Sequence, residues 1–252
     1  MALAVDEEGR RLDHAEVGAA GRHALDGISA LQGRVLRDPA LARDVMDAAS
    51  RGGRVAFLDA AGFAALRGAI VPLLVSSHWP AVWIAECFDP ALVIRLAVLL
   101  EEEGMLARTR VYVTGPNGAL LADLSALRID AGDLAACDRE HLLGGGKRSL
   151  ATYCIDAPGG LRLRPALTDN IVWWQHDIAS DASFHEFQLI VCGRPLAEFQ
   201  YSLRQKALAL FGASLCAFGM LQIDAGGERL GALFERDFNV MPGGRDLYRR
   251  GA

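Results

Sequence analysis

Residues Ala81–Gly104 constrain the fold most, because a buried-strand pattern is followed at once by a helix pattern. The run Ala81–Ala85 is apolar at every position, which is typical of a strand buried on both faces of a parallel sheet. The run Ala91–Leu100 has the apolar spacing of an amphipathic helix. A strand that leads directly into a helix predicts one unit of a doubly wound α/β sheet.

The turn between these two elements lacks glycine and reads Glu86-Cys87-Phe88-Asp89-Pro90. In α/β domains that bind a nucleotide or cofactor, glycine at this turn lets the backbone approach the ligand and leaves N–H donors free at the helix N-terminus. Here Phe88 brings a large ring, and Pro90 has no N–H group. We therefore expect the fold to be retained and the pocket to be changed.

The ends of the helix are nevertheless well specified. Asp89 suits the N-cap, Pro90 the first helical position and Gly104 the position just after the helix. We therefore expect a strand over Ala81–Cys87 and a helix over Asp89–Glu103. Glu101, Glu102 and Glu103 would close this helix, where acids oppose the helix dipole, so we expect a solvated end.

Strand and helix patterns continue to alternate after this unit, which predicts a doubly wound sheet. The further predicted elements are strands over 110–114, 171–176, 187–192 and 217–223, a helix over 203–215, and a last hairpin within 238–250. A chain of 252 residues suits one compact α/β domain with a small appendage. Trp173 and Trp174 are adjacent on one predicted strand, so their rings should lie on opposite faces, one in the core and one available to a partner.

Two further regions complete the predicted organisation. Apolar residues at three- and four-residue spacing predict helices over Ile28–Asp47 and Ala60–Leu74, so we expect an N-terminal helical region over 1–70 and the α/β domain over 71–252. An irregular stretch, about 123–163, predicts an insertion or a lid. It contains Gly144–Lys147, which lacks the strand and Ser/Thr spacing of a phosphate loop.

Composition excludes several classes of function. A net charge of −5 gives no sign of a nucleic-acid surface. The first residues lack the pattern of a signal peptide, and the apolar run Ala91–Leu100 is too short to cross a bilayer, so we expect a cytoplasmic protein without membrane insertion. The five cysteines and the histidines His176 and His185 show no ligand spacing, so no metal is expected.

The chain resembles the CheR-like chemotaxis-type glutamate O-methyltransferases from about Ile28 to Arg250. The stretches that carry the resemblance are LQGRVLRDPAL (31–41), FAALRGAIVPLL (63–74), LAVLLEEEGMLARTRVYVTG (96–115), SLATY (149–153), QHDIASDASFHEFQLIVC (175–192) and DLYRR (246–250). Proteins of this family transfer a methyl group from S-adenosylmethionine to receptor carboxylates. The resemblance implies a small N-terminal helical domain, here truncated, a Rossmann-like domain with a seven-stranded sheet, and a small receptor-facing β insertion, which we place in the irregular region.

The positions that the resemblance implies for the cofactor are mostly changed. The family's glycine-rich loop, roughly A-G-C-[SA]-[ST]-G-E-E, is Ala85-Glu86-Cys87-Phe88-Asp89-Pro90-Ala91-Leu92 here. The acid that grips the ribose is Gly115, and the asparagine near the adenine is Asp177. The family's Arg-Asn pair and tyrosine are replaced in Gly193-Arg194 and at Glu198, and the arginine of its N-terminal motif is Leu58.

These departures predict that no catalytic residue set is retained and that S-adenosylmethionine and S-adenosylhomocysteine bind weakly or not at all. One lost hydrogen bond to a charged group costs roughly 1.5–3 kcal/mol. Several such losses approach the roughly 8 kcal/mol of a micromolar complex. Arg95 and Arg194 are newcomers near the cofactor cleft, and they either bind an anionic ligand or pair with Glu86 or Glu198.

Three functional hypotheses follow from these residues. The first is a catalytically inactive homologue that acts as a regulatory or scaffolding module in bacterial signalling, with a protein partner such as a chemoreceptor or a response regulator. The second is an active protein-glutamate O-methyltransferase that holds S-adenosylmethionine in an atypical way. The third is a receptor for an anionic small ligand such as a cyclic dinucleotide, for which Arg95 and Arg194 would supply the cations.

Overall fold

The computed structural model describes residues 59–225, 230, 232–241 and 246–251, together with positions 34, 37, 38 and 41. The chain divides into two compact units, 1–54 and 55–252. The predicted helix Ile28–Asp47 lies outside the described residues except at those four positions, and Leu58 also lies outside them. The predicted helix over Ala60–Leu74 is α4 (Ala60–Ser76), which belongs to the second unit.

A seven-stranded sheet forms the centre of the second unit, with the strand order β6-β2-β1-β7-β8-β10-β9. Its strands are β1 (Ala81–Ala85), β2 (Arg110–Gly115), β6 (Ile171–Gln175), β7 (Phe187–Cys192), β8 (Leu215–Gln222), β9 (Phe238–Val240) and β10 (Leu247–Arg250). The first five are mutually parallel, and β10 runs antiparallel to both β8 and β9. The predicted doubly wound sheet and its terminal hairpin are confirmed.

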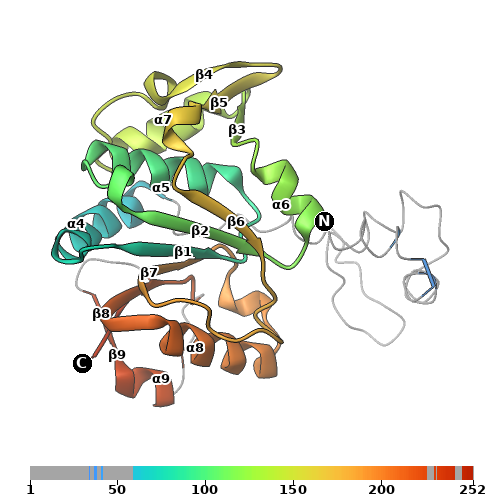
Figure 1. Ribbon diagram of the computed structural model, residues 1–252, viewed down its shortest axis with the longest axis vertical. Coiled ribbons are helices and arrows are strands. Elements are labelled where there is room, and N and C mark those ends of the chain that lie inside the picture. The colour runs from blue at the N-terminus through green and yellow to red at the C-terminus, as the bar shows by residue number, and fades with distance from the viewer. Residues whose placement is uncertain are drawn as a thin grey trace, which may run out of the picture. The chain divides into compact units, whose positions relative to one another are not determined.

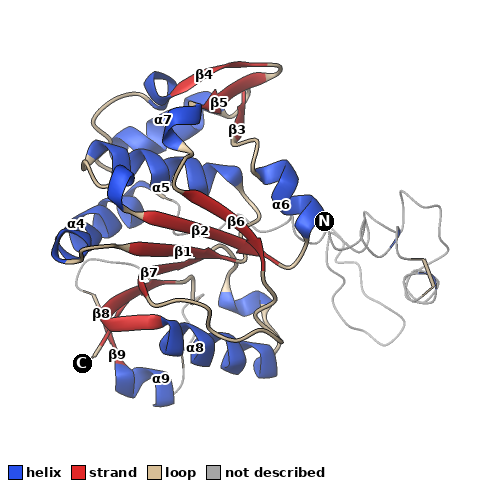
Figure 2. Cartoon of the chain, in the orientation of Figure 1, coloured by secondary structure: helices blue, strands red, loops and turns tan. Residues whose placement is uncertain are grey.

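Helices cover both faces of this sheet (Figures 1 and 2). The helices are α4, α5 (Pro90–Glu102), α6 (Gly118–Leu124), α7 (Leu134–Leu143), α8 (Tyr201–Ser214) and α9 (Ala232–Asp237). One apolar cluster joins α4, α5 and α6 to one face, and a second joins α8 and α9 to the other. Figure 1 shows α4 and α5 on the opposite side of the sheet from α8 and α9.

The strand and helix of the opening motif form as predicted, because their end signals act locally. The Asp89 side chain accepts a 2.8 Å hydrogen bond from the Ala91 N–H group, and Pro90 occupies the first helical position. Gly104 has φ +67°, the left-handed conformation that favours glycine after a helix. Every residue of β1 is buried, as its continuous apolar run predicts.

Trp83, in the middle of β1, anchors the core on the α8 side. Its side chain is fully buried, and its indole N–H donates a 2.8 Å hydrogen bond to the hydroxyl of Thr114 on β2. The rings of Phe187 and Phe211 lie 5.3 and 5.5 Å from it. Trp173 packs against the other core cluster and Trp174 is 60% exposed, so the prediction of opposite faces is confirmed.

The insertion within 123–163 contains a three-stranded sheet of its own, as the resemblance implied. Its strands are β3 (Arg128–Asp130), β4 (Cys154–Ala157) and β5 (Gly160–Leu163), in the order β3-β5-β4 with antiparallel pairing. Helix α7 and four short 3₁₀ turns, η2 (Leu106–Arg108), η3 (Leu150–Tyr153), η4 (Pro165–Leu167) and η5 (Leu196–Glu198), complete the described elements. Residues Ile129, Leu161 and Leu163 face the main core.

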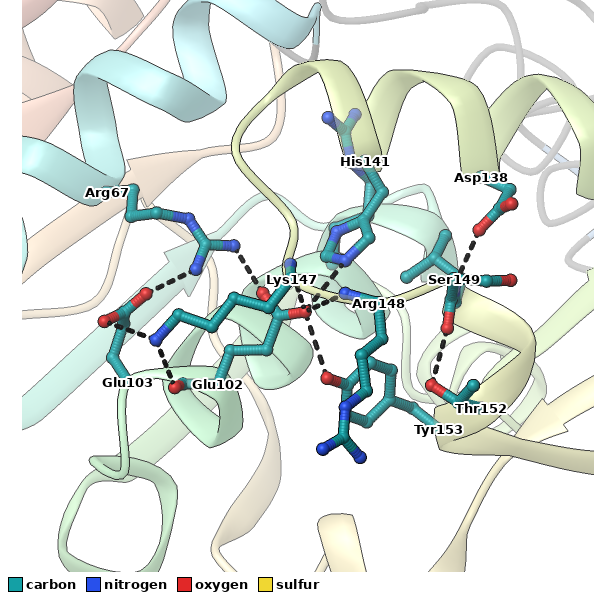
Figure 3. Close-up of polar contacts among 12 residues, drawn as sticks. Arg67, Glu102, Glu103, Asp138, His141, Lys147, Arg148, Ser149, Thr152 and Tyr153 are labelled. Atoms are coloured by element: carbon teal, nitrogen blue, oxygen red, sulfur yellow. Dashed lines mark hydrogen bonds and ion pairs between the residues drawn. The ribbon is translucent and has the colours of Figure 1, made fainter.

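A buried carboxylate at the end of α5 fastens the insertion to the domain, and it corrects the prediction of a solvated helix end. The Glu102 side chain has no exposed surface and accepts hydrogen bonds from Arg67 at 2.7 Å, the Lys147 backbone at 2.8 Å and the Tyr153 hydroxyl at 3.0 Å. His141 Nε2 lies 3.3 Å from the same carboxylate (Figure 3). Tertiary partners therefore outweigh the unfavourable helix dipole.

Candidate functional site

The strand order of the sheet reverses between β1 and β7. The chain builds β1, β2 and β6 outward in one direction and then returns to β7 on the other side of β1. In open α/β sheets, ligands bind where the strand order reverses in this way. The loops that follow β1, β2, β6 and β7 therefore form the candidate site.

Backbone hydrogen bonds hold these four loops together. The Cys87 N–H donates to the carbonyl of Thr114 at 2.9 Å, and the Gly193 N–H donates to the carbonyl of Ala85 at 2.7 Å. The His176 N–H donates to the carbonyl of Gly115 at 3.1 Å. The structure thus brings Glu86, Gly115, Asp177 and Gly193, all named from the sequence, to the same end of the sheet.

Glu86 retains a backbone conformation that usually belongs to glycine. Its φ is +49°, which is uncommon for a residue with a side chain and costs of order 1 kcal/mol. Glu86 occupies the position of the first glycine in the family-like pattern. The turn therefore has the backbone conformation expected for glycine, although a glutamate occupies the position.

Gly193 permits the close contact between the loops after β1 and β7. A Cβ atom built there would lie 2.4 Å from the carbonyl oxygen of Glu86 and 3.2 Å from the Cα of Cys87. Both neighbours are backbone atoms of buried residues, so relief requires the turn itself to move. Gly193 is therefore needed for the packing of these two loops.

Gly193→Ala should lower the free energy of unfolding by about 2 kcal/mol, the usual cost of overpacking a tight site. Gly132→Ala is the matched control, because a Cβ there meets nothing within 4 Å. Urea denaturation of both variants against the parent chain measures the difference. Equal stability of the two variants would contradict the close approach.

Arg194 lies between two carboxylates and two aromatic rings. Its Nε donates to Glu198 at 3.0 Å, and its Nη1 lies 3.8 Å from Glu86. Its guanidinium carbon lies 5.9 Å from the centre of the Phe88 ring and 5.3 Å from that of Phe199. The sequence left two possibilities open for Arg194, an anionic ligand or an ion pair with Glu86 or Glu198. In the structure its guanidinium pairs with both of these carboxylates.

Glu86 is the most perturbed acid of the site. It is 3% exposed, and burial raises its pKa to about 7, against the lowering effect of Arg194 and with a further rise from Asp177. Near neutral pH the carboxyl group is thus present in both protonation states. Cys87 is buried next to it, and burial raises the pKa of this thiol to about 12, so it does not supply a thiolate.

The N-terminus of α5 is occupied by groups of the chain itself. The Asp89 carboxylate accepts from Ala91, and the Leu92 N–H points to the Asp89 carbonyl at 3.3 Å. Pro90 contributes no donor. The donors that a helix N-terminus usually offers to a bound anion are therefore reduced here.

The remaining sequence-named residues lie in different settings. Gly115 ends β2 and brings no side chain to the site, whereas Asp177 accepts from the Ala179 N–H at 2.9 Å and the Ser180 hydroxyl at 3.0 Å. Arg95 is 4% exposed on α5, with its guanidinium carbon 3.8 Å from the centre of the Phe63 ring. Burial lowers the pKa of Arg95 to about 10. Its role as an anion ligand stays a prediction.

Sequence reasoning missed Phe199, which completes the aromatic surroundings of Arg194. It lies in the loop after β7 as the last residue of the family-like segment Cys192–Phe199, and that position is the signal that could have drawn attention to it. Across the part of the chain that the structure describes, no cluster of three or more His, Cys, Asp or Glu residues is arranged to hold a metal ion. No helix among those same residues is both long and apolar enough to span a membrane.

Comparison with known proteins gives one close sequence relative. A Pseudomonas putida KT2440 protein named "Putative methyltransferase Cher3" is 36% identical over 196 residues, which make up 77% of this chain and 71% of that protein. No protein-family model matches the chain.

Solved structures give only distant likenesses. A TehB-like SAM-dependent methyltransferase from Corynebacterium glutamicum covers 89% of this chain and 97% of its own, with a TM-score of 0.36 and 15% identity. CalO1, a methyltransferase of calicheamicin biosynthesis in its SAH-bound form, covers 86% of this chain and 54% of its own, with a TM-score of 0.34 and 13% identity. The family of the chain is therefore assigned from the sequence relative and not from these structures.

Proposed function

This chain belongs to the CheR-like methyltransferase family and has its α/β Rossmann-like fold, and from that premise we propose that it is a non-catalytic member. It would act as a regulatory or scaffolding module in bacterial signalling. One observation carries the proposal: the groups in the loops after β1 and β7 are engaged with one another. An adenosyl cofactor with a carboxylate and a sulfonium group would have to displace them.

The first support comes from the donors available at the turn after β1. A bound amino-acid carboxylate needs free N–H groups at the N-terminus of α5. Asp89 already accepts from Ala91, and Pro90 has no N–H group. The carboxylate of Asp89, and that of Glu86 when it is ionised, would also repel an added carboxylate. The turn therefore suits a closed helix end better than an anion cradle.

The second support comes from the space that side chains occupy. Phe88 is half-buried and packs against the main core cluster, and Arg194 lies between its ring and that of Phe199. Opening this arrangement would separate Arg194 from Glu86 and Glu198. Binding energy would be consumed in that rearrangement before any cofactor contact formed.

The third support concerns the ribose and the adenine. The residue at the end of β2 is Gly115, which offers no carboxylate to the ribose hydroxyls. The carboxylate of Asp177 accepts from its own loop. Each missing charged hydrogen bond costs roughly 1.5–3 kcal/mol, so these changes together approach the roughly 8 kcal/mol of a micromolar complex.

A protein partner is the occupant that we propose for the insertion. Arg128 on β3 and Arg162 on β5 are direct cross-strand neighbours, and both are exposed. Like charges directly opposite each other destabilise a sheet, and no acidic partner of either arginine is found among the described residues. Ile155 of β4 lies beside Arg162 on the same face. An acidic segment of a receptor or a response regulator would relieve this repulsion.

Calorimetric titration tests the proposal. We expect no detectable heat for S-adenosylmethionine or S-adenosylhomocysteine up to about 1 mM, and no shift in melting temperature. Binding at micromolar strength would overturn the inactive reading and support the alternative of an active glutamate O-methyltransferase, which a methyl-transfer assay on receptor carboxylates would then examine.

A titration with a cyclic dinucleotide, run in parallel, addresses the third hypothesis. Arg194→Ala is the matched variant, because it removes the cation that this ligand would need while leaving β1 and α5 unchanged. Binding to the parent chain but not to Arg194→Ala would support a ligand receptor. The absence of heat in both samples would leave the scaffolding function standing.

A further inference from the structure

A hollow lies along α8, away from the loops of the candidate site. It has a volume of about 770 Å³ and lies between α8, α9, β9 and the end of β10. None of its lining residues belongs to the loops after β1, β2, β6 and β7 that form the candidate site. Small-molecule sites typically measure about 300–1,000 Å³, and protein interiors rarely leave voids much larger than a water molecule. Its size is therefore that of a binding site rather than of a packing defect.

The floor of this hollow is apolar. Leu208, Leu230, Phe234 and Phe238 are each at least nine-tenths buried, and the rings of Phe234 and Phe238 stack with centres 3.9 Å apart. Along α8 the floor continues over small residues. Ala209, Gly212 and Ala213 line this part of the floor. A Cβ atom at Gly212 would lie 3.7 Å from the ring of Phe238, so the glycine leaves the helix surface open there.

The rim is polar and carries cations at one end. Tyr201 and Gln205 lie near the start of α8, and residues 201–213 extend over about 18 Å of helix. Arg250 lies at the other end, where its Nη1 donates to the carbonyl of Leu215, just past the end of α8. Arg236 lines the same hollow and pairs with Asp237 at 2.9 Å. An arginine has five N–H groups, and the contact with Leu215 uses one of those of Arg250. The Arg250 guanidinium therefore keeps donors for a ligand.

We propose that this hollow binds an amphipathic carboxylate, with an alkyl chain along α8 and the carboxylate at Arg250. The apolar floor along α8 suits an alkyl chain, and the small residues of α8 allow the chain to lie close to the helix backbone. The cation at one end fixes the direction of the ligand. This site is independent of the proposed function, since it shares no residue with the loops of the candidate site at the strand ends.

Decanoate is the probe, measured by calorimetry and by displacement of 1-anilinonaphthalene-8-sulfonate fluorescence. We expect one decanoate per chain with a dissociation constant below about 100 µM, and at least tenfold weaker binding of decanol, which lacks the charge. Gly212→Leu and Ala209→Leu each fill the hollow and should weaken decanoate binding at least tenfold.

Gly68→Leu is the matched control for the leucine substitutions. Gly68 is an exposed glycine within α4, a Cβ there meets nothing within 4 Å, and it does not line the hollow. This variant should bind decanoate like the parent chain. Absence of binding at 1 mM, equal affinity for decanol, or unchanged affinity in both Gly212→Leu and Ala209→Leu would each overturn the proposal.

Discussion

Glu102→Gln is expected to lower the free energy of unfolding by about 3 kcal/mol, the usual cost of breaking a buried ion pair by changing one partner. For a unit of this size the melting temperature should fall by about 6–12 °C. The amide keeps the length of the side chain but replaces one acceptor oxygen with a donor. That donor would face Arg67, which now reaches the carboxylate at 2.7 Å.

The effect is large because five groups depend on this one carboxylate. Arg67 comes from α4 and His141 from α7, while the backbone N–H groups of Lys147 and Arg148 and the hydroxyl of Tyr153 come from the insertion (Figure 3). Burial alone would raise the pKa of Glu102, but the hydrogen bonds, first of all from Arg67, hold it below its usual value. Its stabilisation is therefore present above about pH 4.5 and is lost only as the pH falls through its folded-state pKa.

The measurement is thermal and urea denaturation of Glu102→Gln beside Glu101→Gln. Glu101 is the neighbouring acid of the same helix and is exposed, so its amide variant should lie within about 0.5 kcal/mol of the parent chain. If both variants lost equal stability, the cause would be the charge of the helix end rather than the buried contacts. Equal stability of Glu102→Gln and the parent chain would contradict the network itself.

Glu86→Gln should make the protein more stable at alkaline pH than at acidic pH, relative to the parent chain. The pKa of Glu86 rises from 4.5 to about 7 on folding, so between these values the folded state binds a proton that the unfolded state has released. The stability that depends on this proton is complete below pH 4.5 and is lost as the pH rises through about 7. The amide carries no charge at any pH, so this loss disappears.

The expected size follows from the shift, since each pKa unit corresponds to about 1.4 kcal/mol. Between pH 5 and pH 8.5 the unfolding free energy of Glu86→Gln should rise by about 2–3 kcal/mol relative to that of the parent chain. Urea denaturation at both pH values measures this change. Equal pH dependence of the two proteins would show that Glu86 is not buried as described.

Glu198→Gln separates the burial of Glu86 from the loss of an ion pair with Arg194. Glu198 also pairs with Arg194, at 3.0 Å, but its side chain is 38% exposed. An exposed pair contributes at most about 1 kcal/mol, so this variant should change stability little at either pH. A pH-dependent gain in Glu198→Gln equal to that in Glu86→Gln would assign the effect to Arg194 instead.

Local patterns predicted the elements around the site with good accuracy. Asp89, Pro90 and Gly104 define the ends of α5 through contacts within a few residues, so their meaning is readable in the chain itself. The apolar run of β1 and the alternation of strands and helices predicted the parallel sheet for the same reason. The order of family-like segments along the chain predicted the kinship that the Pseudomonas relative confirms.

Other features depend on residues that meet only in the folded chain. Glu102 looked like a solvated helix end, because nothing nearby in the sequence announces Arg67, His141 and Tyr153 as its partners. The sequence named both Glu86 and Glu198 as partners of the two arginines, but Glu86 reaches Arg194 only because β1 and β7 are neighbours. The raised pKa of Glu86 likewise comes from burial, which only the folded chain produces.

The sequence by itself thus determined the family, the sheet, the helix boundaries and the residues that replace a cofactor-binding pattern. The sheet and the helix boundaries follow from short-range spacing, capping and apolar periodicity, which act before the chain is compact, whereas the family and the replaced positions follow from the resemblance. Only the tertiary structure decided which charges are buried, how the loops at the strand ends pack around Arg194, and that a hollow of about 770 Å³ opens along α8. Burial, charge pairing and shape arise from contacts between distant segments, and no local pattern encodes them.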